Sequence, residues 1–298
     1  VQTCALPICS IDTRCGHAWQ SIIKDNQAIF EAHPEYLAMV KGERQTKITP
    51  ASKFCVSNPE VQKIVVNHVL EMFRKNPNWD MVSVEPSDGP GGHCECENCL
   101  KLGSISDRVF TMANVAARAV QKEFPGKLVG LYAYNYHSQP PKFDLEPNVY
   151  VQLTAGFTYG ELSFTELLDV WPTKCKLMGY YDYFSTWVWD FDRLPGGRAN
   201  NLAYLRERIP LYATKHATSL DAESGNNWGL HGRNYYIANR LMWNPQVNVD
   251  ALLDDMRSPA GCPRDHEQWR KHGRRHAHHV IRHGREPVEV REIGRAHV

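Results

Sequence analysis

Residue types suited to catalysis and metal binding gather in one short segment, MVSVEPSDGPGGHCECENC, at residues 81–99. Three of its first four residues are apolar, and they predict a short buried strand. Two carboxylates, Glu85 and Asp88, follow at once, and a glycine-rich turn comes after them. Because α/β enzymes keep catalytic groups in the loops after parallel strands, this segment predicts a catalytic loop.

Three cysteines end the same segment: Cys94, Cys96 and Cys99. A closed structural zinc site takes four nitrogen or sulfur ligands, so these thiols could supply three of them. We expect Cys55, at the end of the preceding predicted strand, to be the fourth ligand, with His93 as its substitute. The spacing is tighter than in the usual CxxC pairs, so reduced thiols packed beneath the loop are the alternative.

Strand-like and helix-like segments alternate along the chain and must position this loop. The expected strands are 52–56, 81–84, 127–134, 148–154, 176–182 and 218–222. Helices are expected at 58–73, where Asn58 and Pro59 supply a cap and a first-turn proline, at about 106–124 and at about 234–243. Apolar strands that alternate with helices indicate a parallel sheet. We predict an α/β fold, an incomplete TIM-type (β/α)₈ barrel that lacks at least its first strand.

Polar residues follow the predicted strands, and in a barrel the carboxyl ends of the strands share one face. Carboxylates, tyrosines and amides on one face are typical of a sugar site, because glycoside cleavage needs a proton donor and a negative or nucleophilic group. The candidate catalytic residues are Asp88, Glu85 and Glu223. The candidate substrate-binding residues are His17, Tyr132, Tyr134, Asn135, Tyr181, Asp182, Trp187 and Trp228. Each could instead be a turn residue, a solvated acid or a packed aromatic.

Charge and hydropathy exclude some partners. The formal net charge is +1, which argues against a nucleic-acid partner bound by phosphate neutralisation. No run of about 18 apolar residues is present, so we expect no membrane span.

The two ends of the chain differ from the rest. VQTCALPI and EIGRAHV resemble translated sequencing-adapter DNA, which implies a fragment of an environmental gene. Residues 257–298 hold seven of the fourteen histidines, with nine arginines and one lysine against five acids. A shifted reading frame explains this run better than a metal-binding or nucleic-acid-binding tail. We therefore expect a non-native segment at 1–10, a catalytic barrel fragment at 11–256, and a frameshifted, adapter-derived tail at 257–298.

Several motifs together resemble one known family. They are HPEYLAMVKGER (33–44), FCVSNPEV (54–61), VSVEPSDG with CECENC (82–99), SDRVF (106–110), YYDYF (180–184), and DAESGNNWG with NYYIANRLMWNP (221–245). They are similar to glycoside hydrolase family 163, a former domain-of-unknown-function group, in collinear order over about residues 15–255. The resemblance implies a barrel related to the hexosaminidases. It also implies a periplasmic or secreted protein that acts on complex N-glycans as a retaining endo-β-N-acetylglucosaminidase.

The resemblance also implies a mechanism in which the 2-acetamido oxygen of the substrate is the nucleophile. One carboxylate then orients the acetamide, and a second is the general acid/base. In the related hexosaminidases these residues are an adjacent Asp-Glu pair, whereas Glu85 and Asp88 are three positions apart. We expect one of these two to act together with Glu223, and their individual roles stay open. The alternatives are a non-catalytic glycan-binding barrel, a glycosidase for another glycan, and a zinc-dependent hydrolase.

Overall fold

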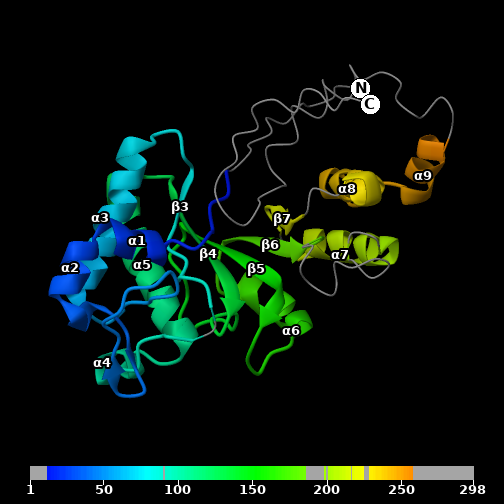
Figure 1. Cartoon of the computed structure of the whole chain (residues 1–298). Coiled ribbons are helices and arrows are strands. Elements are labelled where there is room, and N and C mark those ends of the chain that lie inside the picture. The colour runs from blue at the N-terminus through cyan, green and yellow to red at the C-terminus, as the bar shows by residue number, and fades with distance from the viewer. Residues whose placement is uncertain are drawn as a thin grey trace. The chain divides into compact units, whose positions relative to one another are not determined.

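The computed structural model describes residues 12–89, 91–185, 198, 201–215, 217–224 and 228–257, with the backbone alone at 228–230 and 257. The chain divides into two units, Val1–Tyr180 and Tyr181–Val298. Figure 1 shows the helices and strands. Within the described residues, no helix is both long enough and apolar enough to cross a membrane.

The first unit combines parallel strands with helices. The strands are β3 (Met81–Ser83), β4 (Leu128–Asn135), β5 (Val149–Thr158) and the beginning of β6 (Leu177–Tyr183), and a hairpin of β1 (Met39–Val40) and β2 (Glu43–Arg44) precedes them. The helices are α1 (Trp19–Asp25), α2 (Gln27–Ala32), α3 (Pro59–Lys75), α4 (Glu97–Lys101), α5 (Ile105–Glu123) and α6 (Phe164–Val170), with 3₁₀ turns at Pro34–Tyr36 and Trp171–Thr173. β4 pairs in parallel with β3 and with β5, which confirms the predicted parallel arrangement there.

Local sequence explains where the two longest helices of this unit begin. Asn58 caps α3 by accepting hydrogen bonds from the backbone N–H groups of Glu60 and Val61, and Pro59 occupies the first turn. α5 begins with a capping box, in which Ser104 and Asp107 each bind the other's backbone N–H. Both helices are amphipathic, and they pack against each other.

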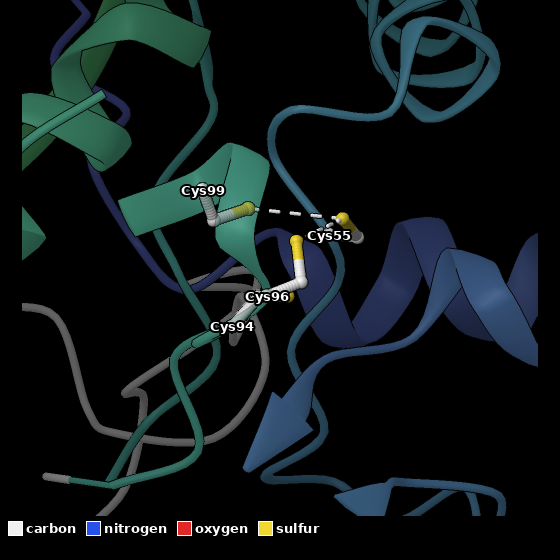
Figure 2. Close-up of side chains that lie close together, drawn as sticks. All are labelled: Cys55, Cys94, Cys96 and Cys99. Carbon is white, nitrogen blue, oxygen red and sulfur yellow. Dashed lines mark hydrogen bonds between the residues drawn. The ribbon is translucent and has the colours of Figure 1, made fainter. Parts of the chain in front are cut away.

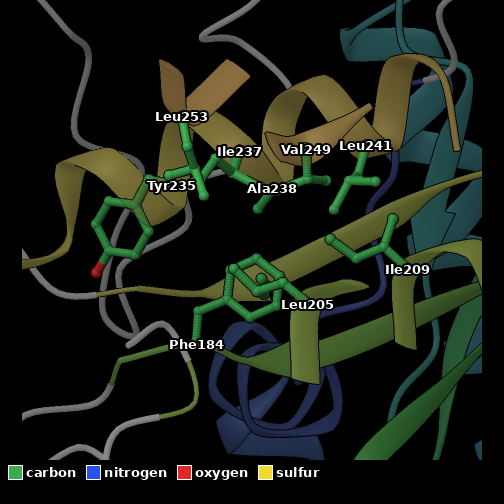
Figure 3. Packing of buried hydrophobic residues seen from close by; sticks show 10 residues of the cluster. Phe184, Leu205, Ile209, Tyr235, Ile237, Ala238, Leu241, Val249 and Leu253 are labelled. Carbon is green, nitrogen blue, oxygen red and sulfur yellow. The ribbon is translucent and has the colours of Figure 1, made fainter. Parts of the chain in front are cut away.

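The second unit holds the end of β6 and the elements that follow. These are α7 (Leu202–Thr214), β7 (Leu220–Glu223), α8 (Trp228–Trp243) and α9 (Val249–Arg257). Buried side chains from α7, α8 and α9 form one apolar cluster around residues such as Leu205, Ile237 and Leu253 (Figure 3). This cluster gives the second unit a hydrophobic core of its own.

The sheet order is β3-β4-β5-β6-β7, which follows the order of the chain. Such an order is compatible with part of an α/β barrel. The α/β class and the strands β3 to β7 are therefore confirmed, and the closed eight-stranded barrel stays a prediction.

The strand predicted at 52–56 is wrong. There Phe54 forms only an isolated antiparallel bridge with Leu37. Phe54 is fully buried, and its ring stacks on that of Trp19 with centroids 4.0 Å apart. The apolar residues of this segment therefore serve core packing rather than sheet pairing. The last predicted helix also begins earlier, at Trp228 rather than at 234.

Candidate functional site

Glu85 is the buried acid of the loop that follows β3. Its side chain is 0% exposed, and its Oε2 accepts a hydrogen bond of 2.9 Å from the backbone N–H of Tyr132. Its Oε1 lies 3.0 Å from Nε2 of His137. A buried carboxylate is costly unless it is paired and hydrogen-bonded, and here both oxygens have partners. Glu85 is therefore held inside the protein and is not offered to solvent.

His137 was not among the residues predicted from the sequence. It lies in the turn after β4 and is 2% exposed, and its Nδ1 has no hydrogen-bond partner among the described residues. The ring of His93 is 6.1 Å away, and burial lowers the pKa of His93 well below its ordinary value. His93 is consequently a neutral ring beside the Glu85–His137 pair. The only sequence signal for His137 was its place two residues after Asn135, at the end of a predicted strand.

Asp88 is the exposed acid of the same loop, since 67% of its side chain is accessible. Its Oδ1 accepts a hydrogen bond of 3.3 Å from the hydroxyl of Tyr134, and it lies 3.6 Å from Nε2 of His17. Burial, together with the charge of Asp88, raises the pKa of Tyr134, so the phenol stays a neutral donor. Asp88 thus presents a carboxylate to solvent with two polar side chains beside it.

Lys53 supports the turn that carries Asp88, and it was not predicted from the sequence. Its side chain is buried, and its Nζ donates to the carbonyl oxygens of Gly89 at 3.1 Å and Asp88 at 3.5 Å. Burial lowers the pKa of Lys53 to about 8, against the opposing charges of Asp88 and Glu85. A lysine buried beneath a loop leaves no periodic pattern in the sequence, which is why it was missed.

The other predicted residues of this unit surround the two acids in different ways. His17 pairs with Glu85 in an isolated parallel bridge, and its Nδ1 donates to the carbonyl of Pro86 at 2.7 Å. Tyr132 reaches Glu85 through its backbone N–H. Asn135 is buried, and its side chain accepts a bond from the next backbone N–H, so it supports the turn.

The four predicted metal ligands do come together. The Sγ atoms of Cys55, Cys94, Cys96 and Cys99 all lie within 4.8 Å of one another (Figure 2). Two of the sulfur pairs are Cys55–Cys96 at 3.6 Å and Cys55–Cys99 at 3.7 Å. Four sulfurs around a tetrahedral zinc ion, each about 2.3 Å from it, are about 3.8 Å apart. The four free thiols therefore have the separations of a tetrahedral metal site, and His93 is outside this group.

Backbone and side-chain donors surround these sulfurs. The backbone N–H of Met39 donates to Cys94 at 3.3 Å, and that of Ser57 donates to Cys99 at 3.4 Å. The guanidinium of Arg44 donates to Sγ of Cys94 at 3.8 Å. Donors of this kind stabilise thiolate charge, as the outer shell of a metal site does.

Asp182, a predicted substrate-binding residue, lies in the second unit and is completely buried. Its carboxylate accepts hydrogen bonds from Arg198 at 2.9 Å, Tyr204 at 2.7 Å and Tyr212 at 3.0 Å. These donors stabilise the buried charge and fix the end of β6. The geometry favours a structural role for Asp182.

Glu223 ends β7 and is half-buried. Its Oε2 lies 3.5 Å from the hydroxyl of Tyr181, so two of the predicted residues are neighbours. Trp187 lies outside the described residues. Trp228 begins α8, and its side chain lies outside them as well.

The parallel strands, and the polar groups in the loops after β3 and β4, define an α/β protein with a candidate site at the carboxyl ends of these strands. The chain belongs to the family described as "Domain of unknown function (DUF4838)", whose model matches residues 7–259. No curated protein matches the chain.

Proposed function

We propose that this protein is a glycoside hydrolase of the family 163 type, which cleaves complex N-glycans as a retaining endo-β-N-acetylglucosaminidase. The observation that carries the proposal is the setting of Asp88. It is a solvent-accessible carboxylate beside Tyr134 and His17, in the loop after a parallel strand. This position and chemistry suit recognition of a polar sugar group.

The burial of the two loop acids distinguishes their proposed roles. Glu85 has no exposed surface and both of its oxygens are hydrogen-bonded, so it positions the loop through His137 and Tyr132. Asp88 is accessible, and it accepts a hydrogen bond from Tyr134. An accessible carboxylate can also accept a hydrogen bond from the N–H of a 2-acetamido group. Asp88 is therefore the acetamide-orienting residue in our proposal. Glu223 stays the predicted general acid/base.

In this mechanism the acetamide oxygen attacks the anomeric carbon while the acid protonates the departing glycosidic oxygen. A cyclic oxazolinium forms, and the leaving sugar carries away the proton. The same residue, now a base, then takes a proton from water as the water opens the ring. Two inversions at one carbon give net retention.

The stereochemistry and the participation of the acetamide can be tested directly. Proton NMR of the first-formed product should show the β-anomer before mutarotation. A thiazoline analogue of the oxazolinium should inhibit the wild type, and Asp88→Asn should bind this analogue at least about ten-fold more weakly. A first-formed α-anomer would contradict the mechanism. Asp144→Asn is the matched control, because Asp144 is an exposed aspartate of the same unit.

We also propose that the ion suited to the four cysteines is zinc. Four thiolates with tetrahedral separations are the donor set of a closed structural zinc site. All four positions would be filled by protein, so the ion would stabilise the loop without taking part in hydrolysis.

A further inference from the structure

Exposed aromatic rings occupy the carboxyl ends of β4 and β5. Tyr136 is 49% exposed, Phe157 is 37% exposed and Tyr159 is 43% exposed. None of the three was predicted as a site residue from the sequence. Single exposed apolar residues are common, but a group of aromatic rings at the ends of neighbouring strands is typical of a binding surface.

The rings form two pairs across these strands. Tyr136 and Tyr159 have centroids 5.3 Å apart, and Tyr134 and Phe157 have centroids 6.0 Å apart. The two pairs flank the position where Asn135 lies opposite Thr158 in the sheet register. The two ring pairs therefore lie on either side of one register position at this edge, and we call Tyr134, Tyr136, Phe157 and Tyr159 the aromatic rim.

The backbone that carries the rim has an unusual conformation at both strands. Asn135 has a φ of 55° and Phe157 has a φ of 56°, which for residues other than glycine is uncommon. Such conformations persist where surrounding contacts impose them, and they concentrate at functional sites. Here Tyr159 N–H donates to the hydroxyl of Ser138 at 3.0 Å, and that hydroxyl donates back to the carbonyl of Tyr159 at 3.1 Å.

The rim is continuous with the proposed catalytic loop through Tyr134. The hydroxyl of Tyr134 donates a hydrogen bond to Asp88. The rings of Tyr134 and Phe157 are in a T-shaped contact with an interplanar angle of 71°. A ligand group at Asp88 would therefore lie beside the ring of Tyr134, which in turn contacts the ring of Phe157. Pyranose rings have apolar faces made of C–H groups and polar edges made of hydroxyls, and tyrosine offers a ring and a hydroxyl to match both.

We infer that the aromatic rim is a carbohydrate subsite that binds pyranose rings of the glycan next to the sugar at Asp88. The inference rests on the proposed function, because it takes the ligand at Asp88 to be a sugar. It goes further by assigning a surface that distinguishes long glycans from short ones. Tyr136 and Tyr159 supply the stacking faces at the outer end of this surface.

The test compares a long with a short ligand. Isothermal titration would measure binding of a biantennary complex-type glycopeptide and of N,N′-diacetylchitobiose to Asp88→Asn, in which we expect strongly reduced turnover. Three double variants are made in the Asp88→Asn background. In them Tyr136 and Tyr159 are both changed to Ala, both to Leu, or both to Phe. Leucine keeps bulk without an aromatic face, and phenylalanine keeps the face without the hydroxyl. Thermal unfolding confirms that each variant is folded.

We expect the Ala and Leu pairs to weaken binding of the glycopeptide about ten-fold and to leave chitobiose within about two-fold, because only the longer ligand reaches the two rings. The Phe pair should retain most of the affinity. Unchanged glycopeptide binding by folded Ala and Leu variants would overturn the subsite. If the wild type hydrolyses nothing but binding still depends on these rings, the proposed hydrolysis fails and the subsite stands.

Discussion

Two acids three positions apart in the sequence have opposite environments, and this contrast carries the functional proposal. The residues around Glu85 and Asp88 in the sequence do not distinguish one acid from the other, because both acids follow the same short strand. What separates them is His137, 52 positions further along, which pairs with Glu85 inside the protein. Contacts between residues this far apart in the chain form when β4 pairs with β3, so no local sequence pattern predicts them.

Stability measurements should therefore separate the two acids. Glu85→Ala leaves His137 and the N–H of Tyr132 buried without their acceptor, and we expect a loss of about 2–5 kcal/mol in the free energy of unfolding. Asp88→Asn should change it by less than about 0.5 kcal/mol, because the side chain is exposed. Urea unfolding of both variants measures the difference. Equal stabilities would contradict the assigned burial.

At the scale of elements, sequence patterns predicted strands β3 to β7 and the three longest described helices, α3, α5 and α8, and they missed the shorter helices. Strands β3 to β6 were predicted because each contains a run of apolar residues, whereas β7 has two acids among its four residues. Helix α3 was predicted from its cap and its apolar face, and α5 from its apolar face alone. The hairpin of β1 and β2 was missed. Its strands have two residues each, and its turn uses Lys41 and Gly42 at φ values of 53° and 81°, without an Asn-Gly signal.

The capping box of α5 predicts a specific pH dependence. The pKa of Asp107 is lowered, because hydrogen bonds from the N–H groups of Lys142 and Ser104 outweigh burial, which acts to raise it. The folded pKa lies below the ordinary value of 3.8, so this stabilisation is present above that value and is lost as the pH falls through the folded pKa. Asp107→Asn should cost about 1–2 kcal/mol near pH 7 and progressively less below about pH 4.

Urea unfolding of wild type and Asp107→Asn over a pH series measures this dependence. The difference in the free energy of unfolding between the two proteins should shrink as the pH falls below about pH 4. A difference that stays constant there would rule out the titration of Asp107 as its source. Asp144→Asn, at an exposed aspartate, should show no such difference at any pH.

The cysteine cluster joins the segment before α3 to the segment that begins α4. We therefore predict that the stability of this region depends on a bound metal ion. Protein purified without added metal should hold about one zinc ion per chain by mass spectrometry of metals, and a chelator should lower the unfolding temperature. Cys55→Ser should lose the ion. Cys175→Ala should keep it, because Cys175 is a buried thiol outside the cluster. Metal-free protein with an unfolding temperature insensitive to chelators would contradict the zinc proposal.

For the whole molecule, the pattern of alternating elements predicted the α/β class, and the match over residues 7–259 gives the family. The same pattern predicted the candidate acids, tyrosines and histidine after the strands, because sites in α/β proteins form at the carboxyl ends of parallel strands. Lys53, His137 and the three exposed rings of the aromatic rim (Tyr136, Phe157 and Tyr159) required the three-dimensional structure. Each acts through neighbours that are distant in the chain or through exposure, and neither property has a periodic signal.

The most direct test of glycan hydrolysis at Asp88 is mass spectrometry of the glycans released from a complex-type glycoprotein. The wild type and Asp144→Asn should release glycans that lack one core N-acetylglucosamine. Asp88→Asn and Glu223→Gln should remain folded and release about 10² to 10⁴-fold less. A folded wild type that releases nothing, or Asp88→Asn that releases glycans at the wild-type rate, would contradict the account.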